Sequence, residues 1–426
     1  MKRRVAITGI GAVTPLGNTA ADTWQGLAQG RSGIGPLTTF DASTFAVRIA
    51  GQVRGFDEGE GEGEGAGEVG RDGRLSRAAR FGVAAARQAL RDAGGDRIDV
   101  DPYERGAAIA GTVGRPPLQE LIDMSQRIIS SDHRELYRQA PADVALRSQN
   151  AGAAAIADSA DCRGPLISLS TACAGAAHAI GEAYRHIQEG DCALMLAGGF
   201  DALTTWMDVL GFSLLGALTD RFNDTPQQAS RPFDARRSGF VVGEGAVMVV
   251  LEDYDRALAR GARVHGELTG YSSTLNAYRI TDSPPDGGGA SAAMRGALTE
   301  AELAPDAIDY VVAHGTGTPG NDVSETAAIK DVFGRHAYDV PISSPKSMTG
   351  HLTSAAAGVN LLAALGAIRH GLIPPTLNLD RPDPQLDLDY VPLHARRHRV
   401  RAALVNAFAF GGTNACLVVR AAEART

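Results

Sequence analysis

Cysteine and lysine are scarce in this chain. It has 426 residues but only 4 cysteines, and no two of them form a Cys-x-x-Cys pair. So few cysteines exclude a disulfide framework and a zinc-ligand pattern, and they favour a reducing, cytoplasmic setting. Because lysine is rare while arginine is abundant, each lysine deserves separate consideration. The cysteines are Cys162, Cys173, Cys192 and Cys416, and the lysines are Lys2, Lys330 and Lys346.

Long apolar runs are absent as well. No segment reaches the roughly 20 apolar residues that a membrane-spanning helix needs. The chain begins with basic residues, as signal peptides do, but the apolar run that follows is short and is interrupted by Gly9, Gly11 and Pro15. We therefore expect neither a leader nor a membrane anchor.

An excess of positive charge is also missing. The formal net charge is −8, which disfavours nucleic acid as a partner. Residues 55–73 consist largely of glycine and acidic side chains. Such a segment has too little apolar surface to build a core, so we expect an exposed loop.

The chain does contain a regular alternation of strand and helix patterns, which is typical of α/β proteins. A strand, a polar turn and a buried helix occur in that order twice, which predicts two similar halves, residues 1–262 and 263–426. In the first half we expect strands at 4–10, 106–113, 165–169, 193–197 and 239–251, a turn at Gly198-Gly199, and helices at 19–29, 74–93, 118–138, 142–157 and 173–189. In the second half we expect strands at 308–313 and 341–344, further strands flanking 406–414, and a small-residue helix ending near 370.

The pair Gly9-x-Gly11 follows the first strand and invites a dinucleotide-binding interpretation. The third glycine of that fingerprint would fall at Thr14, and no acidic partner for a ribose follows a second strand. We interpret the pair as part of a turn that leads into a helix.

Cys173 follows the apolar strand 165–169 and begins a helix that should end at Gly190. The unpaired N–H groups and the positive dipole end of a helix favour an anion there. A thiol in that position ionises more easily, and the thiolate is the nucleophile. A cysteine among small residues is more often a packed side chain, so this position alone does not establish an enzyme.

Polar residues gather in segments that end strands or lie in glycine-rich turns. A histidine at a strand end is more often structural, so each segment alone is weak. The segments are Thr171-Ala-Cys173, His314-Gly-Thr-Gly-Thr-Pro, Lys346-Ser-Met-Thr-Gly-His351 and Phe410-Gly-Gly-Thr-Asn414.

In this order, the segments resemble the active site of the β-ketoacyl-acyl-carrier-protein synthases. The resemblance is to the elongating type II branch and to the ketosynthase subunits of dissociated polyketide synthases. It covers nearly the whole chain and implies a thiolase-like α/β fold, with two similar αβαβα halves in five layers, usually paired as a dimer. The matching segments also include Val5-Ala-Ile-Thr-Gly-Ile-Gly11, Ala229-Ser-Arg-Pro-Phe-Asp234 and Pro374-Pro-Thr-Leu-Asn-Leu-Asp380.

The resemblance implies a role for each matched residue. Cys173 would accept the acyl chain, and its N–H and that of Phe410 would form the oxyanion hole, with Gly411 allowing close approach. Neutral His314 and His351 would donate hydrogen bonds to the malonyl thioester oxygen during decarboxylation. Lys346 would set the local field and hold His351 in place. Thr316 and Thr318 would bind the phosphopantetheine arm, which arrives on an acyl carrier protein, so the chain needs no cofactor or metal of its own.

One position departs from the family pattern. A glutamate is usual in the helix after the second histidine, and Asn360 stands there instead. Because a buried lysine without a counter-charge is costly, another carboxylate is expected near Lys346. We predict that Glu325 pairs with Lys346, directly or through water, with Asp322 as the alternative.

Partners follow from the same resemblance. Acyl carrier proteins are acidic, so we expect a basic docking site. A solvated helix face is the alternative interpretation of the arginines on the helix that begins at residue 74. The second partner would be another copy or a chain-length-factor homologue, and its side chains would help to set pocket depth around Val113 and Phe212. The docking candidates are Arg71, Arg74, Arg77 and Arg221.

Several functions stay open from the sequence. A catalytic polyketide or polyene ketosynthase is preferred because of Asn360, with fatty-acid elongation as the second possibility. A non-catalytic chain-length factor is disfavoured because such partners typically lack the cysteine, which is present here. A thiolase or an initiating synthase acting on coenzyme A is disfavoured because the initiating type uses Cys, His and Asn in place of two histidines.

Overall fold

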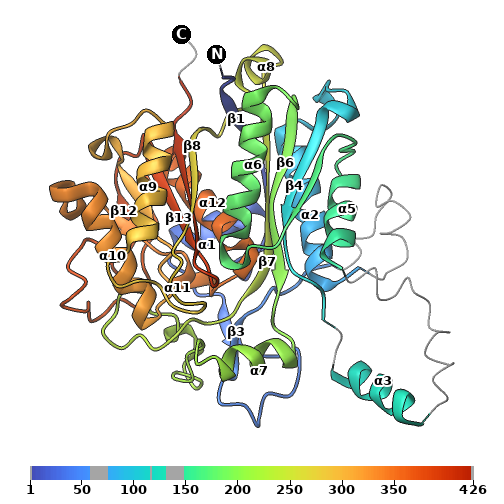
Figure 1. Ribbon diagram of the computed structural model, residues 1–426, viewed down its shortest axis with the longest axis vertical. Helices are drawn as coiled ribbons and strands as arrows, with labels where there is room; N and C mark the ends of the chain where they lie inside the picture. Colours follow the sequence, from blue (N-terminus) through green and yellow to red (C-terminus); the bar gives the residue numbers. More distant parts are fainter. Residues whose placement is uncertain (1, 58–74, 116–117, 131–147, 424–426) are drawn as a thin grey trace.

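A computed structural model describes residues 2–57, 75–115, 118–130 and 148–423. Their main sheet has ten strands in the order β10-β9-β13-β14-β8-β1-β7-β6-β4-β5 (Figure 1). Two further sheets of two strands each pair β2 with β3 and β11 with β12. Among the described residues, no helix is both long and apolar enough to cross a membrane.

The elements of the first half have the following bounds: β1 (Val5–Val13), α1 (Ala20–Ala28), β2 (Ile34–Pro36), β3 (Ile49–Gly51), α2 (Arg77–Ala93), β4 (Arg105–Ala110), α3 (Leu118–Ser130), α5 (Gln149–Asp158), β5 (Leu166–Leu169), α6 (Gly175–Glu189), β6 (Leu194–Ala202), α7 (Trp206–Leu214), β7 (Glu244–Asp253) and α8 (Tyr254–Ala259). Those of the second half are β8 (Gly266–Leu275), α9 (Gly288–Glu300), β9 (Tyr310–Val312), α10 (Pro319–Phe333), β10 (Ile342–Ser343), α11 (Lys346–Thr349), α12 (Ala356–His370), β11 (Leu372–Ile373), β12 (Arg396–Arg397), β13 (Ala402–Phe408) and β14 (Thr413–Arg420).

The two halves repeat one sheet topology. The first half runs β5-β4-β6-β7-β1 and the second runs β10-β9-β13-β14-β8, so corresponding strands occupy corresponding places. The pairings also agree: β4 with β5 and β6 are parallel, as are β9 with β10 and β13. The pairs β1–β7 and β8–β14, which lie near the centre of the ten-stranded sheet, are antiparallel. The boundary predicted at residue 262 falls in the connection between α8 and β8, and it stays a prediction.

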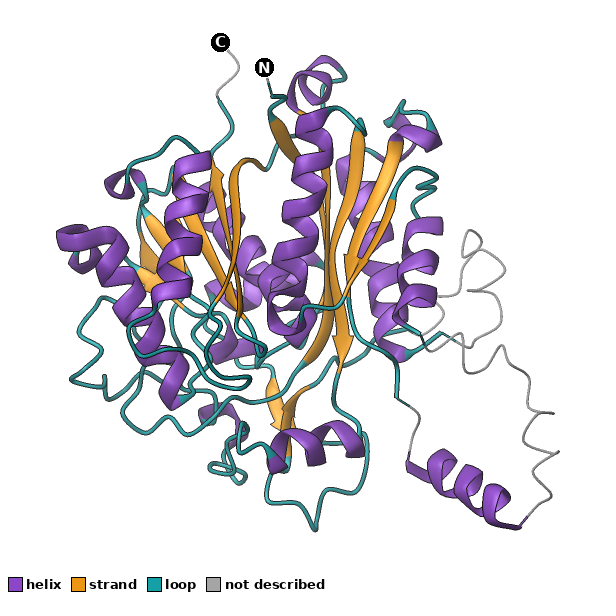
Figure 2. Ribbon diagram, in the orientation of Figure 1, coloured by secondary structure: helices purple, strands orange, loops and turns teal. Residues whose placement is uncertain are grey.

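The helices form layers around these two half-sheets. Helices α6 and α12 pack against each other between the half-sheets, while α2 and α5 cover one outer face and α9 and α10 the other (Figure 2). These are the five expected layers in the order αβαβα, and each half contributes one half-sheet, one outer helix layer and one helix of the central layer. The central layer is almost entirely buried, and its many alanines allow the helices to approach closely.

Most predicted elements are present, with shifted bounds. Thr19 caps α1 and left-handed glycines end α6 and α12, at Gly190 and Gly371, as local sequence signals indicate. The predicted helices 118–138 and 142–157 lie partly outside the described residues, and the loop predicted at 55–73 lies mostly outside them.

Two predictions near the centre of the sheet were wrong. Gly198 and Gly199 do not form a turn but lie inside β6. A β-carbon there would lie 2.1 Å from the Val247 carbonyl oxygen at Gly198 and 2.3 Å from the Ser354 carbonyl oxygen at Gly199. Glycine is therefore needed for close backbone approach within a strand. The strand predicted from Gly239 begins only at Glu244.

Candidate active site

Cys173 lies in a short 3-10 turn (Ala172–Ala174) between β5 and α6. Ala172 has φ +45°, which is uncommon for a residue with a side chain. The same turn occurs in the second half, where Thr353 has φ +44° just before α12. The duplicated fold thus places two equivalent strained turns at the start of its two central helices.

The Cys173 thiol is almost fully buried. Burial raises its pKa to about 11, although the charge of Lys346 and the N–H groups of Phe410 and of Cys173 itself act in the opposite direction. The prediction that the helix start makes this thiol readily ionised was therefore wrong for the resting site. Desolvation outweighs the helix dipole because the sulfur has little access to water.

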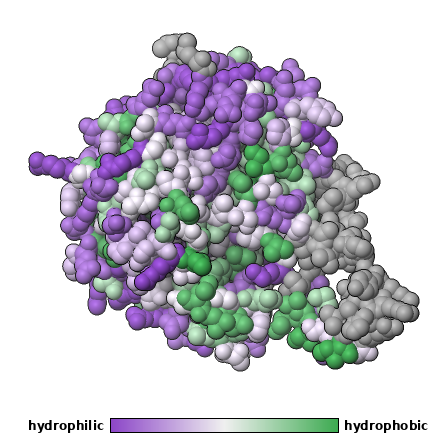
Figure 3. All heavy atoms as spheres, viewed as in Figure 1, coloured by the Kyte–Doolittle hydropathy of each residue, from purple (hydrophilic) through white to green (hydrophobic). Residues whose placement is uncertain are grey.

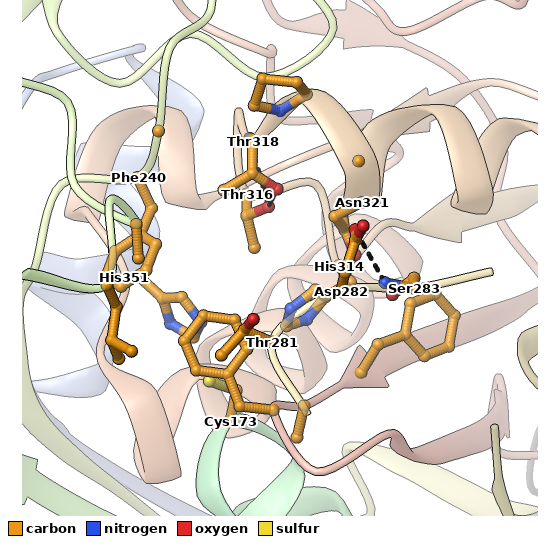
Figure 4. A pocket seen from close by; sticks show the side chains of 18 of the residues that line it. Cys173, Phe240, Thr281, Asp282, Ser283, His314, Thr316, Thr318, Asn321 and His351 are labelled. Carbon is orange, nitrogen blue, oxygen red and sulfur yellow. Dashed lines mark hydrogen bonds between the residues drawn. The ribbon is translucent and has the colours of Figure 1, made fainter. Parts of the chain in front are cut away.

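A pocket of about 190 Å³ leads to the sulfur. Figure 4 shows Cys173 at one end of it, with the rings of His314 and His351 beside the sulfur and Thr316 and Thr318 farther out. The centroids of the two imidazole rings are 5.5 Å apart. The structure thus brings together side chains that are up to 178 positions apart, the separation of Cys173 and His351.

Hydrogen bonds define which nitrogen of each imidazole carries the proton. The Thr353 N–H donates to His351 Nδ1 at 3.1 Å, so the neutral ring has its proton on Nε2. That Nε2 is buried and has no partner among the described residues. In His314, Nδ1 lies 3.5 Å from the Lys346 ammonium, which can only donate, so its proton is also on Nε2.

Both histidines are held neutral. Burial lowers the pKa of His314 and of His351 well below 6.5, and the charge of Lys346 lowers both further. A neutral imidazole costs less to bury than an imidazolium, and it still offers an N–H donor. The predicted neutral state of these histidines agrees with these shifts.

Lys346 contacts His314 and not His351. Its ammonium donates to the His314 carbonyl oxygen at 2.6 Å. The His351 ring is positioned instead by the hydrogen bond from Thr353. The His351 backbone N–H donates to the Val241 carbonyl oxygen at 2.7 Å. The predicted role of Lys346 in holding His351 was therefore wrong.

The direct Glu325–Lys346 contact predicted from the sequence does not form. Glu325 accepts hydrogen bonds from the backbone N–H groups of His314 at 2.7 Å and Gly315 at 2.8 Å, and from Asn406 at 3.0 Å. Burial lowers the pKa of Lys346 to about 8, and the charge of Glu325 partly counteracts this effect. Glu325 thus acts on the lysine through space while it fixes the histidine turn.

Asn360 and Asp322 also serve the backbone. Asn360 donates to the carbonyl oxygens of Ala313 at 3.1 Å and Asn406 at 3.2 Å, which ties the histidine strand end to β13. Asp322 accepts from the Phe233 N–H at 2.8 Å. A carboxylate at position 360 could not donate these bonds, so asparagine suits this arrangement.

The Phe410-Gly411-Gly412 turn joins β13 to β14 and brings the Phe410 N–H to the sulfur. Gly411 and Gly412 have φ of +90° and +82°, and the Gly411 N–H donates to the Ile280 carbonyl oxygen at 2.6 Å. Glycine is needed here for backbone conformation, because nothing lies within 4 Å of a β-carbon at Gly411.

The remaining predicted pocket residues are divided between two places. Thr316 and Thr318 line the pocket and hydrogen-bond to each other at 2.8 Å. Val113 lines a separate small cavity, and Phe212 packs behind Phe240 at 5.6 Å between ring centroids.

Several residues that line this pocket were not predicted from the sequence. Some of them come from loops without a distinctive sequence signal, and only the fold places them here. Among these residues are Phe240, Thr281, Asp282 and Ser283.

The predicted docking arginines differ in their surroundings. Arg77 is engaged in an ion pair with buried Glu244 at 2.8 Å, so it supports the fold. Arg221 is exposed. Arg71 and Arg74 lie outside the described residues.

His178 is a further residue that sequence analysis missed. Its Nδ1 lies 3.0 Å from the Ala174 carbonyl oxygen and 3.1 Å from the Thr171 hydroxyl. Its Nε2 lies 2.9 Å from the Ser273 hydroxyl and 3.4 Å from the Thr413 hydroxyl. This one buried ring therefore links the cysteine turn to the strand that follows the Phe410 turn. A histidine five residues after the cysteine was the available signal.

Comparisons with known proteins agree with this geometry. The family described as β-ketoacyl synthase, N-terminal domain, matches residues 2–257, and the corresponding C-terminal domain matches residues 265–380. A protein named 3-oxoacyl-[acyl-carrier-protein] synthase 2 from Synechocystis is 42% identical over 98% of both chains. The actinorhodin polyketide putative β-ketoacyl synthase 1 of Streptomyces coelicolor is 40% identical over 99% of this chain and 90% of its own.

Solved structures give the same result. A type II polyketide ketosynthase in complex with its acyl-carrier protein superimposes with a TM-score of 0.87 at 31% identity, covering 99% of this chain and 100% of its own. The ishigamide ketosynthase/chain length factor has a TM-score of 0.88 at 33% identity, with the same coverage.

Proposed function

Because this chain belongs to the β-ketoacyl synthase family, we propose that it joins an acyl chain held on Cys173 to a malonyl unit on an acyl carrier protein. The observation that carries this assignment is the meeting of a buried cysteine, two neutral histidines and a lysine at one pocket. Members of this family are acyltransferases, and the phosphopantetheine arm of the carrier supplies the only prosthetic group in the reaction.

The first step transfers the acyl chain. The Cys173 sulfur forms a bond to the acyl carbon, the bond from that carbon to the carrier sulfur breaks, and the thiol proton passes to the departing carrier. The N–H groups of Cys173 and Phe410 stabilise the negative charge on the tetrahedral oxygen. Because burial raises the pKa of the thiol, proton removal has to accompany attack.

The second step uses the two histidines. The carbon–carbon bond to the malonyl carboxylate breaks, CO₂ leaves, and the electron pair becomes an enolate. His351 and His314 donate from Nε2 to the enolate oxygen. The enolate carbon then bonds to the acyl carbon, the Cys173 sulfur leaves, and it takes up a proton.

Separate assays of the two steps test this assignment. We expect Cys173→Ala to abolish acyl transfer while decarboxylation of malonyl carrier continues. His351→Ala should slow decarboxylation by about 100-fold or more, the usual effect of losing one oxyanion donor. Mass spectrometry of the acylated protein and measurement of released CO₂ provide the two readouts. Cys192→Ala is the matched control, because Cys192 is buried away from the pocket. Acylation that survives without Cys173 would contradict the proposal.

The pathway we propose is a type II polyketide or polyene synthase. Its support is the likeness to structures of such ketosynthases, together with Asn360 at a position where glutamate is usual. The identity with 3-oxoacyl-ACP synthase 2 from Synechocystis supports fatty-acid elongation as the second candidate. Pull-down of the tagged full chain from its own cells distinguishes them: a cysteine-lacking homologue in the complex supports the first, and a homodimer the second.

Two kinds of surface support the proposed partners. Exposed apolar side chains gather around α7 near the pocket, including Leu214 and Leu215, and Figure 3 shows this apolar region. Leu166 is exposed on β5, which ends the sheet. An exposed strand edge with apolar side chains suits pairing with a second chain.

Arg221 remains the described candidate for carrier docking. All four cysteines are free thiols, in keeping with the proposed cytoplasmic location.

A further inference from the structure

A second pocket lies apart from the catalytic one and shares no lining residue with it. Its volume is about 590 Å³, within the range of small-molecule sites. Its walls come from β1, the start of α1, the end of α2, the segment before β8 and the end of α12. Nothing in the proposed condensation uses this pocket.

Three arginines surround this second pocket: Arg91, Arg263 and Arg369. None of their guanidinium groups forms a hydrogen bond or ion pair with the part of the chain that the structure describes. The chain as a whole carries a net charge of −8. Three arginines against one lining carboxylate leave a net positive charge around this cavity, which favours an anionic ligand.

One carboxylate, Asp92, also lines the pocket and offsets part of this charge. Burial raises the pKa of Asp92, but the hydrogen bond with His265 and the charges of His265 and Arg263 lower it overall. Asp92 lies 2.7 Å from His265 Nε2 and accepts the Ile10 N–H at 3.0 Å. The arginines also affect their neighbours: the pKa of His370 is lowered by partial burial and then by the charges of Arg369 and Arg263. These two guanidinium groups therefore act on the same part of the cavity.

An apolar wall faces this charge. Trp24 stacks on the His370 ring, with centroids 5.2 Å apart and an interplanar angle of 13°. Gly366 allows this packing, because a β-carbon there would lie 2.1 Å from the indole ring. Leu362 and Leu365 continue the wall. A free inorganic ion would leave this surface and most of the volume unused.

We propose that the second pocket binds a small organic phosphate, with the phosphate held by Arg263 and Arg369 and the organic part against the Trp24 wall. Guanidinium groups match phosphate oxygens in geometry and charge. The assignment does not depend on the proposed condensation.

The indole ring of Trp24 gives a direct readout. The chain has 2 tryptophans, so Trp206→Phe leaves Trp24 as the single tryptophan, which is excited selectively at wavelengths where tyrosine does not absorb. In this full-length background, phenyl phosphate should change the fluorescence saturably. Inorganic phosphate supplies only the phosphate and benzyl alcohol only the aromatic ring. Each should bind at least 10-fold more weakly than phenyl phosphate. Raising the salt concentration should weaken the binding of phenyl phosphate.

Variants locate the site. The Arg263→Gln, Arg369→Gln double variant should weaken phenyl phosphate binding 10-fold or more. Arg335→Gln removes another exposed arginine, outside both pockets, and should leave binding unchanged. Absence of a saturable change, equal binding by inorganic phosphate, or full affinity in the double variant would each overturn the proposal.

Discussion

Lys346 is a buried cation that makes no ion pair with a carboxylate of the described residues. Its ammonium donates to the His314 carbonyl oxygen and lies beside Nδ1 of the same ring. This arrangement fixes the proton of His314 on Nε2 and lowers the pKa of both histidines. The lysine therefore serves the reaction through the histidines, and its effect should be visible in the pH dependence.

An imidazolium still donates hydrogen bonds, but its second proton lies on Nδ1. In acid, His351 would therefore lose the hydrogen bond from the Thr353 N–H. His314 would carry a positive charge beside the Lys346 ammonium, so both rings would lose the contacts that position them. In the unchanged protein, the acid limb of decarboxylation should therefore lie well below pH 6.5. Lys346→Met removes the nearby positive charge, so the histidine pKa values should rise and the acid limb should move to higher pH. CO₂ release from the malonyl carrier, followed from about pH 4.5 to 8.5, measures this shift, because that interval brackets the usual pKa of histidine. Lys346→Arg keeps the charge and should shift the limb less. An unmoved limb in Lys346→Met would exclude this role.

His178 makes a different prediction at the residue scale. Because its ring links Thr171 to Thr413, its loss should misplace the Cys173 and Phe410 N–H groups relative to each other. We expect His178→Ala to slow acylation of Cys173 by about 10- to 100-fold, as expected for a weakened oxyanion hole.

Alkylation by iodoacetamide needs the thiolate but no oxyanion hole, so it serves as the internal control for His178→Ala. Its rate should change by less than about 3-fold, since the surroundings that set the thiol pKa remain. His178→Gln retains hydrogen-bonding groups and should recover part of the acylation rate. Equal losses in both reactions would indicate general damage to the site.

At the scale of elements, the close approach of β6 to the turn before α12 sets the position of the second-half catalytic loop. Gly199 lies against the Ser354 carbonyl oxygen, and Asp201 two residues later accepts the Ser354 N–H at 3.2 Å. This strand therefore positions Thr353, which in turn fixes the His351 ring.

Gly199→Ala should lower the free energy of unfolding by about 2–4 kcal/mol, because a β-carbon would overlap the Ser354 carbonyl. Urea unfolding measures this loss. Gly211→Ala is the matched control: Gly211 lies inside α7 with nothing within 4 Å of a β-carbon. Alanine there should be neutral or raise stability by up to about 1 kcal/mol. Equal stability of the two variants would refute the close-packing argument.

At the scale of the whole molecule, the ten-stranded sheet is continuous across the two halves but ends at β5. The strand β5 leads directly into the Cys173 turn, so whatever pairs with its edge also supports the nucleophile. We therefore expect the second subunit to affect the catalytic site as well as the size of the assembly.

Leu166→Asp places a charge on this exposed strand and should weaken the proposed dimer. Light scattering after size-exclusion chromatography should show a monomer fraction that grows on dilution. Tyr338→Asp changes a similarly exposed apolar side chain in the second half and should leave the size unchanged. A Leu166→Asp dimer as stable as the unchanged protein would place the interface elsewhere.

The sequence alone determined the chemistry and the approximate elements. The order of Cys173, His314, Lys346 and His351, with a glycine-rich turn near the end, resembles the β-ketoacyl synthases, and this resemblance predicted a ketosynthase. Alternating patterns predicted the α/β class and the two halves, since strand and helix periodicities are local properties. Caps such as Thr19 and Gly190 likewise depend on neighbouring residues alone.

Only the tertiary structure decided the electrostatics and the partners of these residues. Burial raises the pKa of Cys173 despite the helix dipole. Glu325 accepts hydrogen bonds from two backbone N–H groups, and Lys346 donates to the His314 carbonyl oxygen. Gly198 and Gly199 read locally as a turn, yet a neighbouring strand and the Ser354 turn require them inside β6. Desolvation, hydrogen-bond choice and close packing all depend on atoms far apart in the chain, and only the folded chain brings those atoms together.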